Sequence, residues 1–406
     1  MRRGRLKKIL SDYKEKTSPK NNTIGSIFKH YRLESGYTLE EVSQGNCSVS
    51  YLCKVENNQL IPSENILGKI VSKLKLEDKI YNQKINKKPY INEILLKGTV
   101  EKILLKEVEN ENDYKSKLIR LANYIMNDCN INKANHIAKD IFQYYIFFTE
   151  DEMSFYLYLL MKLNYLNENY YDVVAIYEDT LLFSENELIK IYMKKTTLKS
   201  LYRLKLFKEA RRLYEEISVE LYKLNFKQEI EEINEYELSS LARVINKDEL
   251  LNKLVTFNNL KIKTDLIWYN HYFYYEKNFL KALEHIELIK HLNDEYLAYY
   301  LICLERLNLQ NRLIDEIKNI EYKDENSYGM IIEYFKERYL PTENKKPLRE
   351  AISKIELKTD DTFVLKYILE SVINELSNKY LYKEAFELSK KIIKIYKKRE
   401  SIMTLS

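Results

Sequence analysis

Apolar residues recur every three or four positions along most of this chain, the spacing that places them on one face of an α-helix. Leu198, Leu201 and Leu204 form such a stripe, and Phe207 closes a polar turn after it. Ala210 then allows a second helix to approach closely. The pattern predicts an all-α protein in which short polar turns join the helices. No run of 18 apolar residues occurs, so we expect no transmembrane helix.

The composition supports this fold class. Only 7 of the 406 residues are Gly and 5 are Pro, and Gly98 and Gly329 bracket 230 residues that contain neither. Because turns between strands depend on these residues, strand-rich and α/β folds are nearly excluded. A single coiled coil is the competing arrangement, but the apolar residues keep no sustained heptad register and 36 Tyr are spread along the chain. We therefore expect helical hairpins in at least two domains.

A turn motif repeats along the chain, with an aromatic or aliphatic residue, two further residues and then a small one. Its instances are Ile131–Ala134, Tyr171–Val174, Phe207–Ala210, Phe279–Ala282 and Tyr382–Ala385. The gaps of 40, 36, 72 and 103 residues fit one, one, two and three units, with degenerate units expected near Leu238–Leu250 and at 300–350. The motif resembles the tetratricopeptide repeat over roughly residues 115–400, without that family's proline or first-helix glycine. The resemblance implies a right-handed superhelix with a concave face.

Residues 24–74 carry the start signals of four short helices. Thr38 and Glu41 form a capping box, Gly36 ends the first helix, and the second and third helices are joined around Asn46. This is helix-turn-helix geometry. The N-cap candidates are Thr23, Thr38, Ser48 and Ser63. The expected core comprises Phe28, Tyr31, Val42, Leu52, Val55, Ile66, Ile70 and Leu74.

This segment resembles the phage-repressor-type helix-turn-helix domain. The matching positions are Ile24-Gly25, Lys29, Arg32, Gly36, Thr38, Tyr51-Leu52, Lys54 to Asn57 and Pro62-Ser63. The resemblance implies that Arg32 pairs with Glu56, the alternative being two separate surface charges. Leu39 stands where the family usually has a Gln that reaches a phosphate, so we expect that contact to be absent. The implied DNA-binding residues are Lys29, Val49, Ser50, Tyr51 and Lys54.

Among these, Val49 suits a thymine methyl group and Lys54 suits a phosphate. Ser50 suits a base edge or a phosphate, or is simply solvated. Positive charge also gathers here, because residues 1–80 carry 15 Lys+Arg and 9 Asp+Glu, a net of +6. The whole chain is +5, so the remainder carries −1, which favours a polyanion-binding head on a near-neutral body. The basic arm at 1–23 either reaches a minor groove or is a solvated tail.

A helix-turn-helix head followed by tetratricopeptide repeats resembles the RRNPP family of quorum-sensing regulators. The resemblance implies a homodimer that binds a palindromic operator in double-stranded DNA and receives a short imported signalling peptide on its concave face. Side-chain amides both donate to and accept from an extended peptide backbone. Counting 11 and 7 residues back from the small residue of a turn gives groove candidates: Asn123, Asn127, Lys199, Arg203, His271, Tyr275, Asn374 and Asn378.

The two Asn pairs either clamp a peptide or are solvated, and Lys199 with Arg203 suits a carboxylate. Trp268, the only Trp, is expected to pack rather than contact a ligand. We expect an arm at 1–23, the helix-turn-helix domain at 24–76, connecting helices at 77–114 and a peptide-binding and dimerisation domain at 115–406. The competing functions are a repeat module that binds and inhibits a partner protein, and a constitutive repressor whose repeats only dimerise.

No phosphate-binding loop, dinucleotide fingerprint, nucleophile elbow or zinc-protease motif occurs, so we expect neither an enzyme nor a cofactor. The five His and four Cys show no metal-binding spacing, and free thiols are expected at Cys47, Cys53, Cys129 and Cys303. No apolar stretch of signal-peptide length follows the basic start, so a cytoplasmic location is expected.

Overall fold

The computed structural model describes residues 24–57, 59–60, 62–74, 90–109, 114–141, 148–180, 186–256, 264–320, 327–340, 362–378 and 380–403. Every regular element in these ranges is a helix, so the chain is all-α, as its apolar pattern predicts. None of the described helices is long and apolar enough to cross a membrane. The basic arm, with Thr23, lies outside the described residues. Contacts divide the chain into two compact units, residues 1–159 with 182–186 and residues 160–181 with 187–406.

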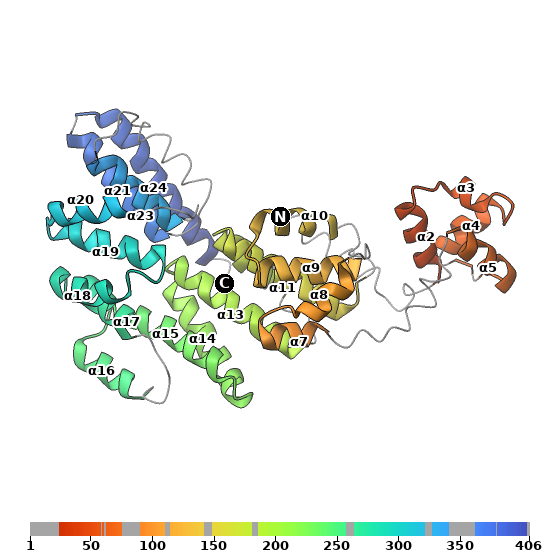
Figure 1. The fold of residues 1–406 in the computed structure, drawn as a ribbon, viewed down its shortest axis with the longest axis horizontal. Coiled ribbons are helices and arrows are strands. Elements are labelled where there is room, and N and C mark those ends of the chain that lie inside the picture. Colours follow the sequence, from red (N-terminus) through yellow and green to blue (C-terminus); the bar gives the residue numbers. More distant parts are fainter. Residues whose placement is uncertain are drawn as a thin grey trace. The chain divides into compact units, whose positions relative to one another are not determined.

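Four helices form the head (Figure 1): α2 (Ile24–Glu34), α3 (Leu39–Ser43), α4 (Val49–Glu56) and α5 (Glu64–Lys73). All eight expected core residues lie in one apolar cluster among them, together with Val71, Tyr37, Leu39, Cys47, Tyr51 and Leu67. The helical spacing of the sequence therefore identified the core of this segment correctly.

The predicted helix starts and stops of the head are mostly present. Gly36 follows α2 with φ +72°, a left-handed backbone that glycine adopts without steric cost. Thr38 and Glu41 form the reciprocal capping box of α3. Ser48 accepts a hydrogen bond from the third backbone N–H of α4. Ser63 stands at the N-cap of α5 but makes no side-chain cap bond. Three of the four expected N-caps are thus occupied by the expected residue.

The first unit also contains α7 (Tyr90–Lys97), α8 (Lys102–Val108), α9 (Tyr114–Met126), α10 (Ile131–Ile141) and the first part of α11 (Glu150–Leu166). α9 and α10 form a helical hairpin, and Ala134 is fully buried where they meet. This hairpin is the first instance of the repeated turn.

The second unit continues with further helical hairpins (Figure 1). The first helices of successive hairpins contact one another, and so do the second helix of one hairpin and the first of the next, which is the stacking of tetratricopeptide-like repeats. The elements are α12 (Tyr170–Thr180), α13 (Glu187–Arg203), α14 (Phe207–Lys223), α15 (Lys227–Leu241), α16 (Lys247–Thr256), α17 (Thr264–Asn270), the π-helix η3 (His271–Tyr275), α18 (Phe279–Ile289), α19 (Asp294–Arg306), α20 (Gln310–Asn319), α21 (Ser327–Tyr339), α23 (Thr362–Asn378) and α24 (Tyr382–Met403).

The turns between helices share a left-handed residue that is not glycine. Among the described residues these are Cys129, Glu168, Lys205, Asn225, Lys277, Asn308 and Tyr380, with φ from +47° to +60°. In each turn, the residue five positions later donates its backbone N–H to the N-cap carbonyl of the following helix. These donors are Ala134, Val173, Ala210, Ile230, Ala282, Leu313 and Ala385. The chain therefore builds a glycine-type turn repeatedly with almost no glycine.

The left-handed turn residue shifts the register of the repeat at 171–174 by one position, and the backbone bonds of the turns also locate the two degenerate repeats. In α12 the residue that corresponds to the small position after the turn is Val173, not Val174, because the backbone N–H of Val173 bonds the carbonyl of Asn169. The degenerate units expected near 238–250 and within 300–350 are present as α15 with α16 and as α19 with α20. Leu250 and Leu313 stand in place of their small residue, which is why the motif was not visible there.

Lys277→Gly is expected to raise the free energy of unfolding by about 0.5–1 kcal/mol. Lys277 is exposed and has φ +57°. Glycine removes a steric cost of roughly 1–2 kcal/mol from the folded state. Because glycine also has more conformational freedom in the unfolded chain, part of this stabilisation is lost. Lys366→Gly, the same change at an exposed position inside α23, should instead lower the free energy by about 1 kcal/mol. Urea unfolding measures both, and shifts of the same sign would contradict this account.

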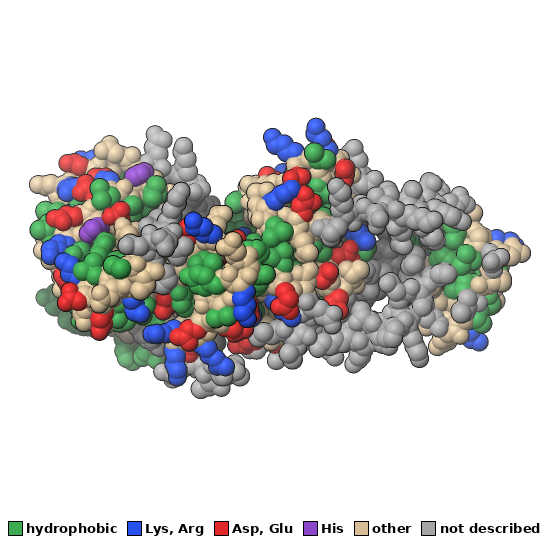
Figure 2. All heavy atoms as spheres, turned by 90° about the horizontal axis from the view of Figure 1, so that it is seen from below, with side chains coloured by type: hydrophobic (Ala, Val, Ile, Leu, Met, Phe, Trp, Pro, Cys, Tyr) green, Lys and Arg blue, Asp and Glu red, His purple; other side chains and the backbone are tan. Residues whose placement is uncertain are grey.

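The described surface carries charges of both signs side by side. On the face seen in Figure 2, Lys and Arg side chains alternate with Asp and Glu. This distribution fits the near-neutral body that the sequence predicts beyond the head.

Candidate functional site

Helix α4 of the head buries one face and exposes the other. Leu52 and Val55 are buried in the head core, whereas Ser50 and Lys54 are exposed and Val49 is 39% exposed although it is apolar. Of the other expected DNA-binding residues, Tyr51 is half-buried against the core and Lys29 on α2 is exposed. The start of α4 can thus meet another surface without unpacking the head.

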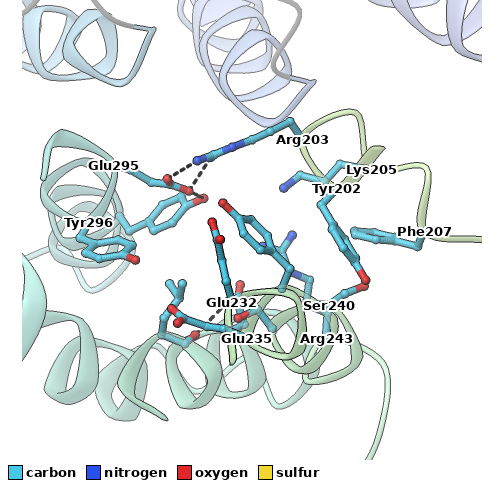
Figure 3. A pocket seen from close by; sticks show the side chains of 15 residues that line it. Tyr202, Arg203, Lys205, Phe207, Glu232, Glu235, Ser240, Arg243, Glu295 and Tyr296 are labelled. Atoms are coloured by element: carbon cyan, nitrogen blue, oxygen red, sulfur yellow. Dashed lines mark hydrogen bonds and ion pairs between the residues drawn. The ribbon is translucent and has the colours of Figure 1, made fainter. Parts of the chain in front are cut away.

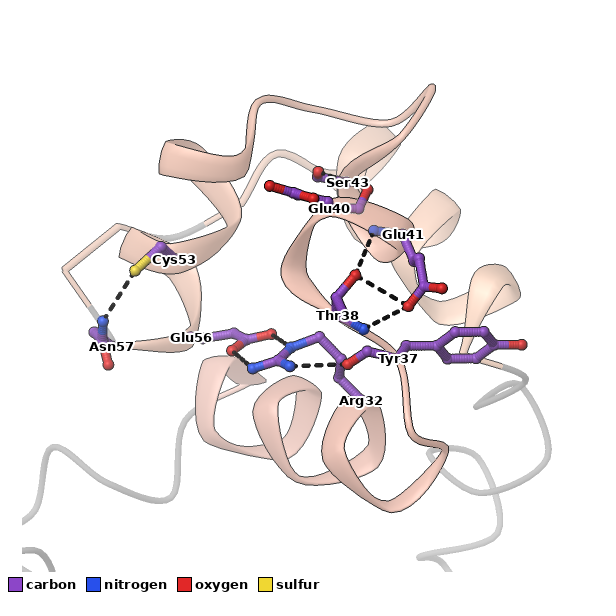
Figure 4. A network of polar contacts seen from close by, with 9 residues as sticks. All are labelled: Arg32, Tyr37, Thr38, Glu40, Glu41, Ser43, Cys53, Glu56 and Asn57. Atoms are coloured by element: carbon purple, nitrogen blue, oxygen red, sulfur yellow. Dashed lines mark hydrogen bonds and ion pairs between the residues drawn. The ribbon is translucent and has the colours of Figure 1, made fainter.

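A buried ion pair holds the other end of α4 (Figure 4). Arg32 donates from Nε and Nη2 to the two carboxylate oxygens of Glu56, at 2.7 and 2.8 Å. Its Nη1 donates to the carbonyl oxygen of Tyr37 at 2.9 Å. The hydrogen bond to Glu56 raises the pKa of Arg32 above its ordinary value. The pairing that the helix-turn-helix resemblance implied is therefore present, and it fastens α2, the following turn and α4 together.

The turn between α3 and α4 is fixed by its own bonds. Gly45 adopts φ +76°, and Asn46 donates from Nδ2 to the carbonyl oxygen of Val42 at 2.9 Å. Leu39, which replaces the family's phosphate-contacting Gln, packs on the head core instead. The direction of α4 is therefore set by the fold of the head alone.

Within the second unit, a cavity of about 260 Å³ lies along the first helices of four hairpins, α13, α15, α17 and α19 (Figure 3). We call it the groove cavity. Its lining combines aromatic rings, charges of both signs and small polar groups, a mixture suited to an extended polar ligand. The lining residues are Tyr202, Arg203, Lys205, Phe207, Glu232, Glu235, Tyr236, Ser239, Ser240, Arg243, Leu266, Asn270, Glu295, Tyr296 and Tyr299.

One ion pair joins distant hairpins across the groove cavity. Arg203 donates from Nη1 and Nη2 to the two carboxylate oxygens of Glu295, at 2.7 and 2.6 Å. Nη1 also donates to the hydroxyl of Tyr328 at 2.8 Å, and Tyr299 donates to Glu295 at 2.9 Å. Burial opposes ionisation of Glu295, but the charge of Arg203 outweighs it and holds the pKa of that carboxyl below its ordinary value.

A second group of charges lies on α13 and α15. Lys195 Nζ is 2.6 Å from Glu232 Oε2, and Lys199 pairs with Oε1 of the same carboxylate. Burial would raise the pKa of Glu232, but the two ammonium groups lower it to about 2. Glu232 is therefore already neutralised by the protein.

No protein-family model and no curated protein matches the chain. One solved structure is similar. It is the crystal structure of Bacillus thuringiensis PlcR in complex with the peptide PapR7 and DNA, at 14% sequence identity and a TM-score of 0.25. The match covers 78% of this chain and 99% of that chain.

Of the eight groove candidates from the sequence, Arg203 lines the groove cavity and Lys199 stands beside it through Glu232. Asn123 on α9 and Asn127 directly after that helix lie in the other unit, and both side chains bond to other parts of the chain. Asn127 accepts from the backbone N–H of Val100 and donates to its carbonyl oxygen, at 3.0 and 2.8 Å. Asn123 is buried and donates to Asp128 at 2.8 Å. The expected two-way amide clamp is thus present at Asn127, but it holds the chain's own backbone.

The two candidates on the π-helix η3, His271 and Tyr275, do not line the groove cavity. His271 is fully buried, with its ring nitrogens 3.2 Å from the carbonyl of Ala242 and from Glu276. Tyr275 is 45% exposed and stacks on His271. A π-turn accommodates one extra residue, so counting 11 residues back through it from Ala282 stops at His271, one position short of the groove-lining Asn270. The residues of α17 that line the cavity are Asn270 and Leu266.

The remaining sequence candidates lie outside the groove cavity, and two residues that do line it were not among the candidates. Asn374 and Asn378 are exposed on α23 and do not line the groove cavity. Trp268 packs between His271, Tyr272 and His285, as expected. Sequence counting missed Ser239 and Arg243, which stand 11 and 7 residues before Leu250. The offsets were correct, but a leucine concealed the turn from which to count.

Proposed function

We propose that this protein is a DNA-binding transcription regulator whose repeat groove binds a short peptide and thereby alters DNA binding. The observation that carries the proposal is the exposed face of α4, with Val49 and Ser50 at its start and Lys54 in its last turn, while Leu52 and Val55 are held in a small core. Helices of this kind read a major groove from their N-terminal residues. A dimer on a palindromic operator is part of the proposal, since the RRNPP resemblance implies it.

The groove cavity supports the peptide half of the proposal. An extended peptide presents backbone donors and acceptors on both edges, and Ser239, Ser240 and Asn270 offer complementary groups. The rings of Tyr236, Tyr296 and their neighbours provide flat apolar surface for side chains. Charged lining residues such as Arg203 and Glu295 are paired with each other, so a peptide can enter without burying their charges anew.

Ser50→Ala combined with Lys54→Ala is expected to weaken specific DNA binding at least about 30-fold, because two contacts of roughly 1–3 kcal/mol each sum to at least about 2 kcal/mol. Lys54→Ala alone should weaken binding across sequences and reduce the salt slope by about one, as the loss of a single phosphate contact does. Ser50→Ala alone should relax the sequence preference.

The probe is a labelled duplex obtained by in vitro selection from random DNA with the full chain, followed by fluorescence anisotropy at fixed salt. Lys69→Ala, at an exposed position of α5, is the control and should stay within about threefold of the wild type. Far-UV circular dichroism verifies that each variant is folded. If the double variant retains selective binding, the assignment of α4 to DNA is wrong.

A further inference from the structure

Arg243, in the turn that follows α15, has a guanidinium that no described carboxylate pairs with. Its guanidinium lies 4.2 Å from the ring centroid of Tyr274 and makes no hydrogen bond or ion pair with any described residue. Its Nε is buried and has no acceptor. Among the three carboxylates that line the groove cavity, Glu232 and Glu295 are bound by other cations, and Glu235 makes no ion pair with Arg243. Leaving a charged donor unsatisfied in a protein interior costs stability, so its presence calls for an anion from outside.

Two neighbouring groups in the same lining are also unsatisfied. Asn270 is only 1% exposed, and its Nδ2 donates to the carbonyl of Leu266 at 2.9 Å, which fixes the orientation of the amide. Its Oδ1 is then left buried without a donor. The hydroxyl of Ser239 is likewise buried without a partner. Since buried polar atoms are nearly always paired, three unpaired ones around one cavity indicate a ligand with matching groups.

The unpaired groups define that ligand. Arg243 and Ser239 can donate to an anion, and Asn270 Oδ1 can accept from an N–H. A guanidinium matches a carboxylate in shape as well as in charge. A carboxylate with an amide N–H close by is what the last residue of a peptide presents, and also what an Asp or Glu residue inside a peptide presents.

We propose that Arg243, Ser239 and Asn270 form the subsite of the groove cavity that binds a carboxylate of the peptide and the amide N–H beside it. The inference rests on the proposed function, because it assigns part of the same groove. In the protein without ligand, Arg243 should therefore contribute nothing to the stability of the fold.

The first test needs no ligand. Arg243→Met should raise the melting temperature of the full chain by about 2–4 °C, because it replaces an unpaired cation by an apolar side chain that still packs on Tyr274. Differential scanning calorimetry measures the shift. A melting temperature at or below that of the wild type would mean that the guanidinium serves the fold, which would overturn the proposal.

The second test uses a library of synthetic heptapeptides with free C-termini, retained by the full chain and identified by mass spectrometry. Arg243→Gln should weaken binding of the retained peptides at least about 10-fold, and Arg243→Lys should restore part of it. Amidating the C-terminus, or replacing Asp and Glu by Asn and Gln, identifies the carboxylate concerned. That change should weaken binding to the wild type and have little further effect on Arg243→Gln.

The outcomes separate the two proposals. If Arg243→Gln binds the retained peptides as tightly as the wild type does, the subsite is wrong while the peptide-receptor function stands. If the wild type retains no peptide, the proposed function of the groove fails.

Discussion

Arg32→Met is expected to unfold the head while the repeats stay folded. The substitution leaves the carboxylate of Glu56, buried in the head, without its bidentate partner. Removing one partner of a buried pair costs about 3–5 kcal/mol. A domain of this size has a net stability of roughly 3–8 kcal/mol, so most of it is lost. Specific DNA binding should disappear with it.

Amide hydrogen exchange of the full chain, resolved by peptides, measures this directly. Peptides from residues 24–74 should exchange rapidly in the variant, and those from residues 187–256 should keep the wild-type protection. Lys54→Met, the same loss of a cation at an exposed position of α4, should leave the protection of the head unchanged. Wild-type protection of the head in Arg32→Met would show that the pair does not hold it together.

Arg203→Met is expected to lower the free energy of unfolding of the repeats by about 3 kcal/mol. Arg203 and Glu295 are each only 19% exposed, and they connect α13 to α19 across 92 positions of sequence. Without the guanidinium, the carboxylate of Glu295 is left desolvated and unpaired. The double variant Arg203→Met with Glu295→Leu should recover most of the loss, because an apolar pair of similar volume replaces the ionic one. Urea unfolding of the four proteins completes the double-mutant cycle.

The pH dependence of this loss has a definite sign. In the wild type the pKa of Glu295 is lowered, so the pair stabilises above the ordinary carboxyl pKa of 4.5 and loses this contribution as the pH falls through and below it. In Arg203→Met, burial is opposed only by the hydrogen bond from Tyr299 and the charge of Lys205, so the pKa of Glu295 is higher than in the wild type. The difference between wild type and variant should therefore be largest near pH 7 and shrink toward about pH 4. A deficit that does not change with pH would contradict the role given to Glu295.

The head could be predicted from the sequence almost completely, because its signals are local. Thr38 and Ser48 cap the helices they precede, Gly36 adopts the left-handed turn, and the pairing of Arg32 with Glu56 followed from a motif of about fifty residues. Capping and glycine preferences act within a few positions of the chain, so they survive in any tertiary context.

The groove was only partly predictable, because its register depends on features that carry no local signal. Nothing in the sequence around His271 announces a π-turn, yet one extra residue rotates every preceding position of α17 by about a third of a turn. Leu250 in place of a small residue hid the hairpin that supplies Arg243. The amide of Asn127 suited a peptide chemically, but only the fold shows that Val100 occupies it.

The central claim is that the head and the groove are coupled, and DNA binding in the presence of peptide tests it most directly. Fluorescence anisotropy would follow the selected duplex with the full chain at fixed salt, with and without a saturating peptide retained from the library. The account predicts selective DNA binding whose dissociation constant the peptide shifts at least tenfold, a coupling of about 1.4 kcal/mol. DNA binding without sequence preference, or selective binding that no retained peptide alters, would contradict it.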